Sequence, residues 1–201
     1  RLHGLMALIA VLSISSANVA AEQRDSTDLT GKNFTSEELV KALAIPVRGI
    51  GSNCASYQRQ MVQLTRGLGR VPTTKEEVPS LKPMRTASVT ATFAKDSAVL
   101  TPAAKANLDK VADALKSSEL STQCFQVAGH TCDLRAQGHN MDLSRRRAEA
   151  VKAFLIAKGV DGDRLVTTGF GQTSPLVPND SEPSRQKNRR VDLGALPPPG
   201  V

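Results

Sequence analysis

The sequence predicts an α/β fold in which helices cover one face of a β-sheet, and two periodic patterns support this prediction. Short segments between residues 86 and 194 alternate apolar and polar side chains, as half-buried strands do. Longer segments between them carry apolar residues three and four positions apart, as amphipathic helices do. Strands that alternate with helices usually form a sheet with helices packed against it. We therefore expect a β/α/β/α/β sandwich built on a mixed four-stranded sheet.

Four segments carry the strand pattern. The alternation of Val89, Ala91 and Phe93 with polar residues predicts a first strand that begins at Ser88. The other strands are expected at residues 125–129, 164–168 and 189–193.

Two helices are predicted between these strands. The first opens at Thr101-Pro102, because proline is favoured in the first turn of a helix. Its apolar face consists of Leu108, Val111, Ala112 and Leu115. The second begins at Asn140 and carries the apolar residues Leu143, Val151, Phe154 and Leu155.

Residues 1–21 have the pattern of an export signal, in which a basic start precedes a short apolar run and small residues. The apolar run is too short to span a membrane, and a buried N-terminal helix is the alternative reading. Residues 22–85 form an N-terminal extension, partly helical and of unknown role, with a short helix capped by Ser36 and a second helix near residues 58–68. The proline-rich tail, residues 195–201, ends the regular structure.

Export would place the three cysteines in an oxidising compartment. Five residue steps from Cys124 to Gly129 along a strand span about 16 Å, whereas a disulfide needs Cα atoms within about 7 Å. Only three further residues lie before Cys132, so we predict that Cys124 and Cys132 do not pair. Cys54 can pair with either, and three free thiols are equally compatible with the sequence.

The composition narrows the class of partner. The net charge of +7 favours an anionic partner, although it also serves solubility. Aromatic residues make up only 3% of the chain and Trp is absent, which argues against base stacking and hence against single-stranded nucleic acid.

Several spaced motifs occur in a fixed order. Gly129-His130-Thr131 precedes Asn140, Leu143-Ser144 and Arg147-Ala148, and Asn188-Arg189-Arg190-Val191 follows them. This order resembles the OmpA-like C-terminal family, whose pattern reads GHTD, N-x-x-L-S-x-x-R-A and NRRV, and FAKDSAVL at residues 93–100 resembles its opening strand and loop. The resemblance covers about residues 88–193.

This resemblance implies an exported envelope protein of the periplasm, associated with the cell wall or outer membrane. Its partner would be peptidoglycan, held without covalent attachment through the diaminopimelate of the stem peptides. Other envelope proteins would be further partners. No catalysis, cofactor or metal is implied.

The residues support such a site independently. Asn140, Ser144 and Arg147 are spaced by four and three and share one helix face near its N-terminus, where an anion is favoured. Arg147 can bind a carboxylate with two parallel hydrogen bonds. The expected ligand-binding residues are Asp96, Thr131, Asp133, Asn140, Arg147 and Arg189.

Each of these features has a simpler interpretation. Residues 145–147 could be a solvated helix face, and we assign ligand binding to Arg147 and solvent exposure to the other two. Asn140 could be a helix N-cap, or both cap and bind. His130 is expected to be structural, because a His/Cys metal site with His139 and Cys132 lacks the usual close paired spacing.

One position departs from the family pattern. Cys132 stands where the family has the aspartate of GHTD, and Arg135 stands where it has a glycine. Either Asp133 takes over the ammonium of the ligand, or that contact is lost. A protein-interaction module that kept the fold and lost the ligand is therefore a competing hypothesis. A wall hydrolase is a third, but no paired-carboxylate, metal or nucleophile–base arrangement can be assembled from the sequence.

Overall fold

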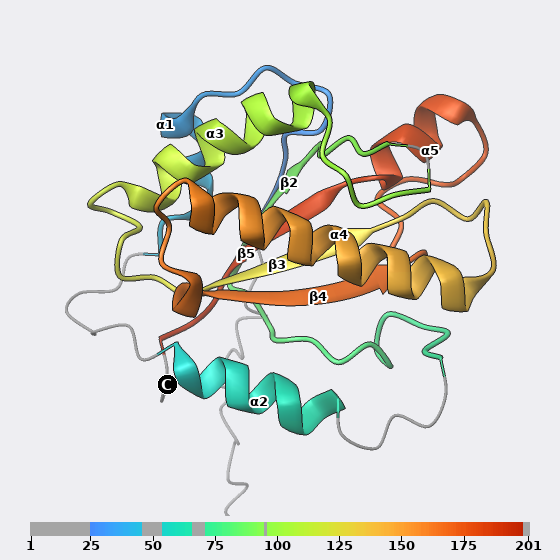
Figure 1. The fold of residues 1–201 in the computed structure, drawn as a ribbon, viewed down its shortest axis with the longest axis horizontal. Helices are drawn as coiled ribbons and strands as arrows, with labels where there is room; N and C mark the ends of the chain where they lie inside the picture. Colours follow the sequence, from blue (N-terminus) through green and yellow to red (C-terminus); the bar gives the residue numbers. More distant parts are fainter. Residues whose placement is uncertain (1–24, 46–53, 66–70, 95, 199–201) are drawn as a thin grey trace, which may run out of the picture.

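The structure is a computed structural model that describes residues 25–45, 54–65, 71–94 and 96–198. The predicted export signal lies outside the described residues. The elements in chain order are β1 (Asp25–Asp28), α1 (Ser36–Leu43), α2 (Ala55–Thr65), β2 (Arg85–Val89), α3 (Pro102–Lys116), β3 (Phe125–His130), α4 (Gln137–Ala157), the 3-10 turn η1 (Gly162–Arg164), β4 (Leu165–Gly171), α5 (Glu182–Asn188) and β5 (Val191–Ala195). Figure 1 shows their arrangement.

The strands form one mixed sheet in the order β1-β2-β5-β3-β4. The strand β5 runs antiparallel to both of its neighbours, β2 and β3, while β3 and β4 are parallel. The mixed sheet was predicted, but it contains a fifth strand because β1 from the N-terminal extension pairs in parallel with β2. The sequence of β1, DSTD, is polar and mostly exposed, so it carries no strand periodicity.

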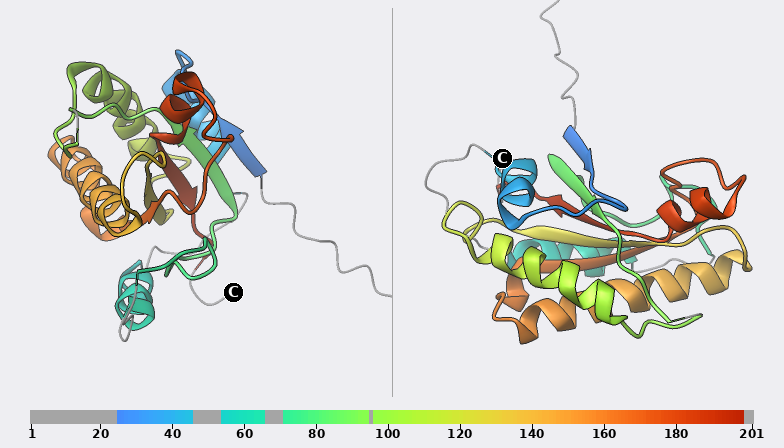
Figure 2. Two further views of the ribbon diagram at one scale, coloured as in Figure 1. Left: turned by 90° about the vertical axis from the view of Figure 1, so that its right-hand side faces the viewer. Right: turned by 90° about the horizontal axis from the view of Figure 1, so that it is seen from above.

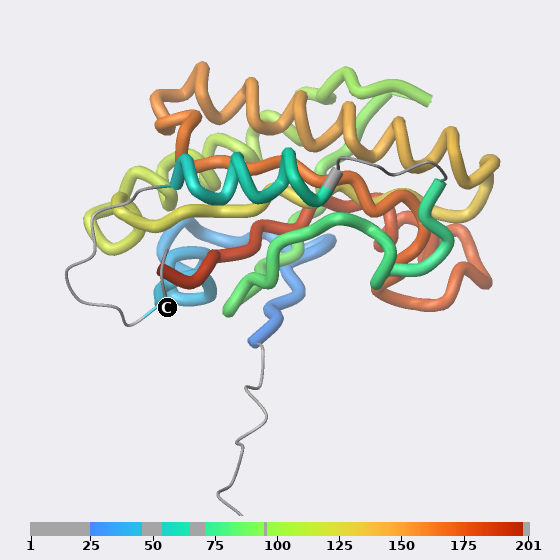
Figure 3. The backbone as a smooth tube through the Cα atoms, turned by 90° about the horizontal axis from the view of Figure 1, so that it is seen from below, coloured from blue at the N-terminus to red at the C-terminus, as the bar shows by residue number. Residues whose placement is uncertain are grey.

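Helices α3 and α4 cover one face of the sheet, and α1 packs beside α3 (Figures 1 and 2). Alternate strand residues such as Phe125, Val127 and Leu165 face these helices and are fully buried. We expected helices on one face only. The opposite face is also covered, because α2 and residues 71–83 cross it (Figure 3). A second apolar cluster, which includes Tyr57, Leu81 and Val166, forms there.

The predicted helix starts needed correction. The N-cap of α1 is Thr35 rather than Ser36, and Thr35 and Glu38 form a reciprocal capping box. Helix α4 begins three residues before Asn140, after an N-cap at Ala136 whose side chain makes no capping hydrogen bond. In contrast, Thr101 caps α3 as predicted, and its hydroxyl accepts a hydrogen bond from the Ala104 amide at 3.2 Å.

The strand boundaries also shifted. The first predicted strand occupies residues 85–89 instead of 88–93, and Phe93 forms only an isolated bridge with Leu100. Helix α2 starts at Ala55, before the predicted residue 58. Helix α5 was not predicted, because its sequence, EPSRQKN, has no apolar face.

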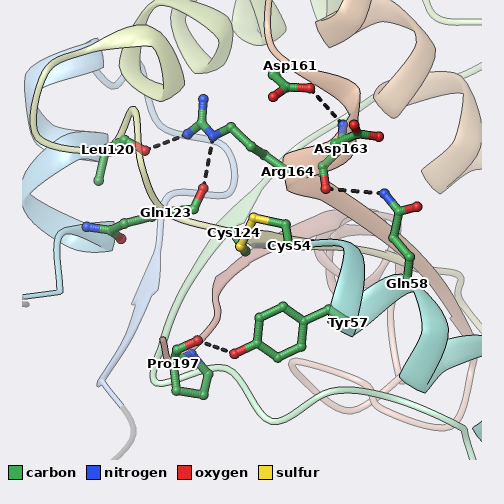
Figure 4. Close-up of a disulfide and its surroundings, with 10 residues drawn as sticks. All are labelled: Cys54, Tyr57, Gln58, Leu120, Gln123, Cys124, Asp161, Asp163, Arg164 and Pro197. Atoms are coloured by element: carbon green, nitrogen blue, oxygen red, sulfur yellow. Dashed lines mark hydrogen bonds between the residues drawn. A yellow bond between two sulfur atoms is a disulfide. The ribbon is translucent and has the colours of Figure 1, made fainter. Parts of the chain in front are cut away.

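A disulfide between Cys54 and Cys124, with Cα atoms 5.7 Å apart, joins the N-terminal extension to the start of β3 (Figure 4). The prediction that Cys124 and Cys132 do not pair is confirmed, since Cys132 is free and buried. Near the disulfide, the Tyr57 hydroxyl donates to the Pro197 carbonyl, and the Gln58 side chain donates to the Asp163 carbonyl at 3.2 Å.

Candidate functional site

The predicted site residues come from four segments at one end of the molecule, around the C-terminal end of β3 and the N-terminal half of α4. Thr131, Cys132 and Asp133 directly follow β3, and Arg189 follows α5. Asp96 lies in the loop that connects β2 to α3. The parallel neighbour β4 ends beside β3, where the Thr131 amide donates to the Gly171 carbonyl at 2.8 Å.

Asn140 holds the loop that follows β3. Its side-chain nitrogen donates to the carbonyl of Cys132 at 3.1 Å, to the carbonyl of Arg135 at 3.0 Å and to the Gln172 side chain at 2.5 Å. The residue is buried inside α4, so the interpretation of Asn140 as an N-cap was wrong. The structure gives Asn140 a positioning role, and direct contact with a ligand stays a prediction.

Ser144, one turn further along α4, links this helix to the end of β4. Its hydroxyl donates to the Met141 carbonyl and accepts from the Gly171 amide, both at 2.8 Å. These two bonds fix the height of α4 above the sheet, and therefore the position of Arg147 on the following turn.

Arg147 is the central cation of the site. Its side chain is buried, with 6% of the residue exposed, and the guanidinium lies over the Phe93 ring with Cζ 4.7 Å from the ring centroid. Its Nε donates to the Ser97 carbonyl at 3.1 Å, but none of the described carboxylates forms an ion pair with it. Burial lowers the pKa of Arg147, and the positive charge of Arg189 lowers it further, whereas Asp96 acts to raise it.

The other two arginines of the run face solvent, as expected. Arg145 pairs with Asp142 at 2.9 Å and Glu149 at 2.7 Å, and Arg146 pairs with Asp142 at 2.8 Å. These three ion pairs follow the i,i+3 and i,i+4 spacing of neighbours on a helix surface. Arg147 therefore differs from Arg145 and Arg146, because it is buried and has no ion-pair partner among the described carboxylates.

Asp96 is held by two residues that sequence reasoning did not assign to it, His139 and Arg135. One carboxylate oxygen lies 2.7 Å from His139 Nε2 and the other lies 3.6 Å from an Arg135 nitrogen. The hydrogen bond from His139, together with the charges of His139, Arg135 and Arg147, lowers the pKa of Asp96. The backbone of Asp96 has a φ of 53°, a left-handed conformation that non-glycine residues adopt uncommonly.

A spacing signal for His139 was present in the sequence. His139, Leu143 and Arg147 are separated by four residues each, so they lie along one face of α4. His139 was considered only as a metal ligand, although the same spacing places it on the helix face of Arg147, where it bonds to Asp96.

Cys132 lies beside the second cation. Its sulfur accepts a hydrogen bond from Arg189 Nη1 at 3.6 Å. The other terminal nitrogen of Arg189 donates to Glu182 and to Gln186. Asp133 turns to Arg185 on α5, with 3.3 Å between Nε and the carboxylate oxygen.

Two further buried polar groups lie next to each other in the sequence, the imidazole of His130 and the hydroxyl of Thr131. The Thr131 hydroxyl is buried without a hydrogen-bond partner among the described residues. His130 faces the opposite side of the sheet, where its Nε2 lies 3.0 Å from Asp192 and its ring stacks on Phe170. In the described part of the chain, no group of three or more His, Cys, Asp or Glu side chains is arranged to hold a metal.

The fold is similar to that of a solved periplasmic domain. The chain resembles the periplasmic domain of Helicobacter pylori MotB (residues 78–256) with a TM-score of 0.51 and 21% identity, over 59% of this chain and 80% of that one. Residues 92–189 match the model of the OmpA family. The predicted resemblance to the OmpA family is therefore confirmed for this part of the chain.

Two curated relatives share the same region. Outer membrane protein A of Bordetella avium is 37% identical over 101 residues, which cover 50% of this chain and 51% of that protein. The peptidoglycan-binding protein ArfA of Mycobacterium tuberculosis is 38% identical over 101 residues, which cover 50% of this chain and 30% of that protein. The matches thus span about half or less of these relatives. Among the described helices, none is long and apolar enough to cross a membrane.

Proposed function

We propose that this protein binds peptidoglycan non-covalently in the cell envelope, through a carboxylate of diaminopimelate in the stem peptides, and does not cleave it. The relatives support the proposal, because one is named a peptidoglycan-binding protein and another an outer membrane protein. A periplasmic location at the cell wall or outer membrane follows from the same relatives. The observation that carries the proposal is Arg147, a buried cation without an ion-pair partner among the described residues.

A buried guanidinium favours a carboxylate for two physical reasons. Removal from water strengthens the attraction between opposite charges, because the local dielectric constant is low. The planar fork of donors also matches both oxygens of a carboxylate at once. The ring of Phe93 and the Ser97 carbonyl hold the guanidinium in place, so that little side-chain freedom is lost when a ligand binds.

The remaining predicted residues take supporting roles in this proposal. Arg189 supplies a second positive charge, and the unpartnered Thr131 hydroxyl supplies a donor. Asp96 and Asp133 form the acidic rim, and Asn140 fixes the loop that carries Thr131 and Asp133.

The test is peptidoglycan co-sedimentation with two variants of neighbouring arginines. Arg147→Ala removes the buried cation and should weaken binding about tenfold or more, since a hydrogen bond to a charged group contributes about 1.5–3 kcal/mol. Arg146→Ala removes an exposed, ion-paired cation of the same helix and should leave binding within about twofold. Circular dichroism and thermal melts would establish that both variants fold.

Unchanged sedimentation of a folded Arg147→Ala variant would contradict the assignment. Release of soluble muropeptides by the wild-type protein would contradict the proposal that it binds without cleavage.

A second candidate function is a protein-interaction module with weakened or lost peptidoglycan binding, whose partners are other envelope proteins. The observation that favours it is Cys132, which stands at the position of the family aspartate. A pull-down on purified peptidoglycan separates the two functions. Binding that free diaminopimelate displaces supports the first, and no binding supports the second.

A further inference from the structure

The charges around Cys132 are unbalanced toward the positive. Arg189 Nη1 donates to the Cys132 sulfur at 3.6 Å, and Cys132 is also within electrostatic range of Arg147. The two cations lie close enough for the charge of one to lower the pKa of the other. A cysteine at this position brings no carboxylate to offset them.

The nearby acids are already engaged by other cations. Asp133 pairs with Arg185, and Asp96 is shared by His139 and Arg135. Glu182 pairs with the outer nitrogen of Arg189. Asp96, Asp133 and Glu182 thus each have a cation from the protein itself, and an ammonium of a ligand would have to compete with that cation.

The Thr131 hydroxyl is a further hydrogen-bonding group at this site. It is buried next to Cys132 and has no partner among the described residues. A hydroxyl can donate to a carboxylate oxygen as readily as it can accept from an ammonium. The next residue, Cys132, lies beside Arg189, and a cation nearby favours an acceptor as the incoming group.

On the basis of the proposed peptidoglycan binding, we propose that this site recognises the carboxylate of its ligand alone and gains nothing from the adjacent ammonium. Its ligand class is a carboxylate-bearing chain end, aminated or not. An ammonium beside Arg147 and Arg189 meets like charges, which oppose binding. A carboxylate meets two cations and one unpaired hydroxyl.

Three small competitors test this directly with the full chain on peptidoglycan. The first is meso-diaminopimelate. The second is pimelate, which has the same seven-carbon chain and both carboxylates without the amines. The third is cadaverine, which keeps the two amines and lacks the carboxylates.

We expect pimelate to displace the wild-type protein at a concentration equal to or lower than that of diaminopimelate, and cadaverine to displace nothing. Cys132→Asp places a carboxylate between the cations and should reverse the order, so that diaminopimelate becomes about tenfold better than pimelate. Cys132→Ser is the matched control and should keep the wild-type order, because it changes the atom without adding charge.

The outcomes separate the inference from the proposed function. If diaminopimelate displaces the wild-type protein and pimelate is about tenfold weaker, the ammonium is recognised and the inference is wrong, while the proposed function stands. If no dicarboxylate displaces the protein, recognition through diaminopimelate fails, and the inference fails with it. The wild-type comparison decides by itself should Cys132→Asp fail to fold.

Discussion

Two buried arginines illustrate how burial can serve either structure or binding. Arg164 donates to the carbonyls of Leu115, Leu120 and Gln123, which closes the turn after α3. Figure 4 shows the bonds to Leu120 and Gln123. Arg147 donates to one carbonyl only and faces no described ion-pair partner. An unpaired buried charge is costly, so Arg147 is a better candidate for a ligand contact than Arg164.

At the residue scale, the sequence predicted the binding cation, Arg147, but not the contacts of the acidic residues predicted with it. The motif around Asn140 and Arg147 predicted the shared helix face, which the structure shows. It could not reveal that Asp96 is held by His139 and Arg135, because those contacts join a loop to residues more than thirty positions away. It also could not show that Asp133 turns to Arg185, since α5 itself was not predicted.

The buried pair of His130 and Asp192 predicts a dependence of stability on pH. Burial lowers the pKa of His130, despite the opposing charge of Asp192. Burial alone would raise the pKa of Asp192, but the charges of His130 and Arg190 hold it well below its usual range. Both shifts make the folded state less stable as the pH falls, because the unfolded chain takes up protons that the folded chain does not.

We therefore expect the free energy of unfolding to fall as the pH drops below about 6.5, the ordinary pKa of histidine, and to fall further below the ordinary pKa of aspartate. The His130 contribution amounts to at most about 2 kcal/mol between pH 6.5 and 5. Urea unfolding at several pH values measures it. His130→Gln should flatten this part of the curve. An unchanged slope in this variant would show that His130 is not the group responsible.

At the scale of elements, two glycines set how closely α4 approaches the sheet. A Cβ atom on Gly129 would lie 2.2 Å from the Ser144 carbonyl oxygen, and one on Gly169 would lie 2.6 Å from the Arg145 amide nitrogen. Both neighbours are helix backbone, which cannot move aside alone. Glycine in β3 and β4 is therefore what lets α4 lie close enough for Ser144 to bond with Gly171.

Gly129→Ala should destabilise the fold by about 1–3 kcal/mol or more, because the added methyl group overpacks the interface between α4 and β3. Gly138→Ala is the matched control in the first turn of α4, where the added carbon would meet only a Val71 methyl group at 3.5 Å. That change should be neutral or stabilise the helix by up to about 1 kcal/mol. Urea unfolding of the two variants measures the difference, and equal stabilities would contradict this account of the packing.

Periodicity predicted the elements that bury an apolar face and missed those that do not. Strands β3 and β4 and helices α3 and α4 were placed correctly in order and within a few residues. Strand β1 and helix α5 are polar, and their positions depend on pairing and capping that no local pattern encodes. Helix α4 starts earlier than its apolar residues indicated, because its first turn is polar. This turn directly follows the loop that Asn140 holds.

At the scale of the whole molecule, the N-terminal extension surrounds the domain that carries the family motifs. Strand β1 extends the sheet at one edge, and α1 packs on α3. Residues 71–83 and α2 cover the face that α3 and α4 leave free (Figures 2 and 3). Strand β1 and helices α1 and α2 lie outside residues 92–189, which match the family. The sequence predicted the extension but not this arrangement, since it depends on contacts between distant residues.

The Cys54–Cys124 disulfide fixes this extension to β3 across a separation of 70 residues. A bond that closes a long loop restricts the unfolded chain, and removal of such a bond typically costs about 2–4 kcal/mol. The double variant Cys54→Ser with Cys124→Ser should lower the free energy of unfolding by that amount in urea titrations. It should also make α2 more susceptible to limited proteolysis, because the disulfide is a covalent link between the residue before α2 and the start of β3.

Peptidoglycan binding by the double variant should be retained, because the disulfide lies at the start of β3 and Arg147 lies beyond its other end. Cys132→Ser is the control, and its stability should respond to reducing agents as the wild-type protein does. Non-reducing peptide mapping should find one linked pair, Cys54 with Cys124, and a thiol at Cys132. A peptide that links Cys132 to either partner would overturn the arrangement of the extension on the sheet, and with it the charge balance assigned to the site around Arg147.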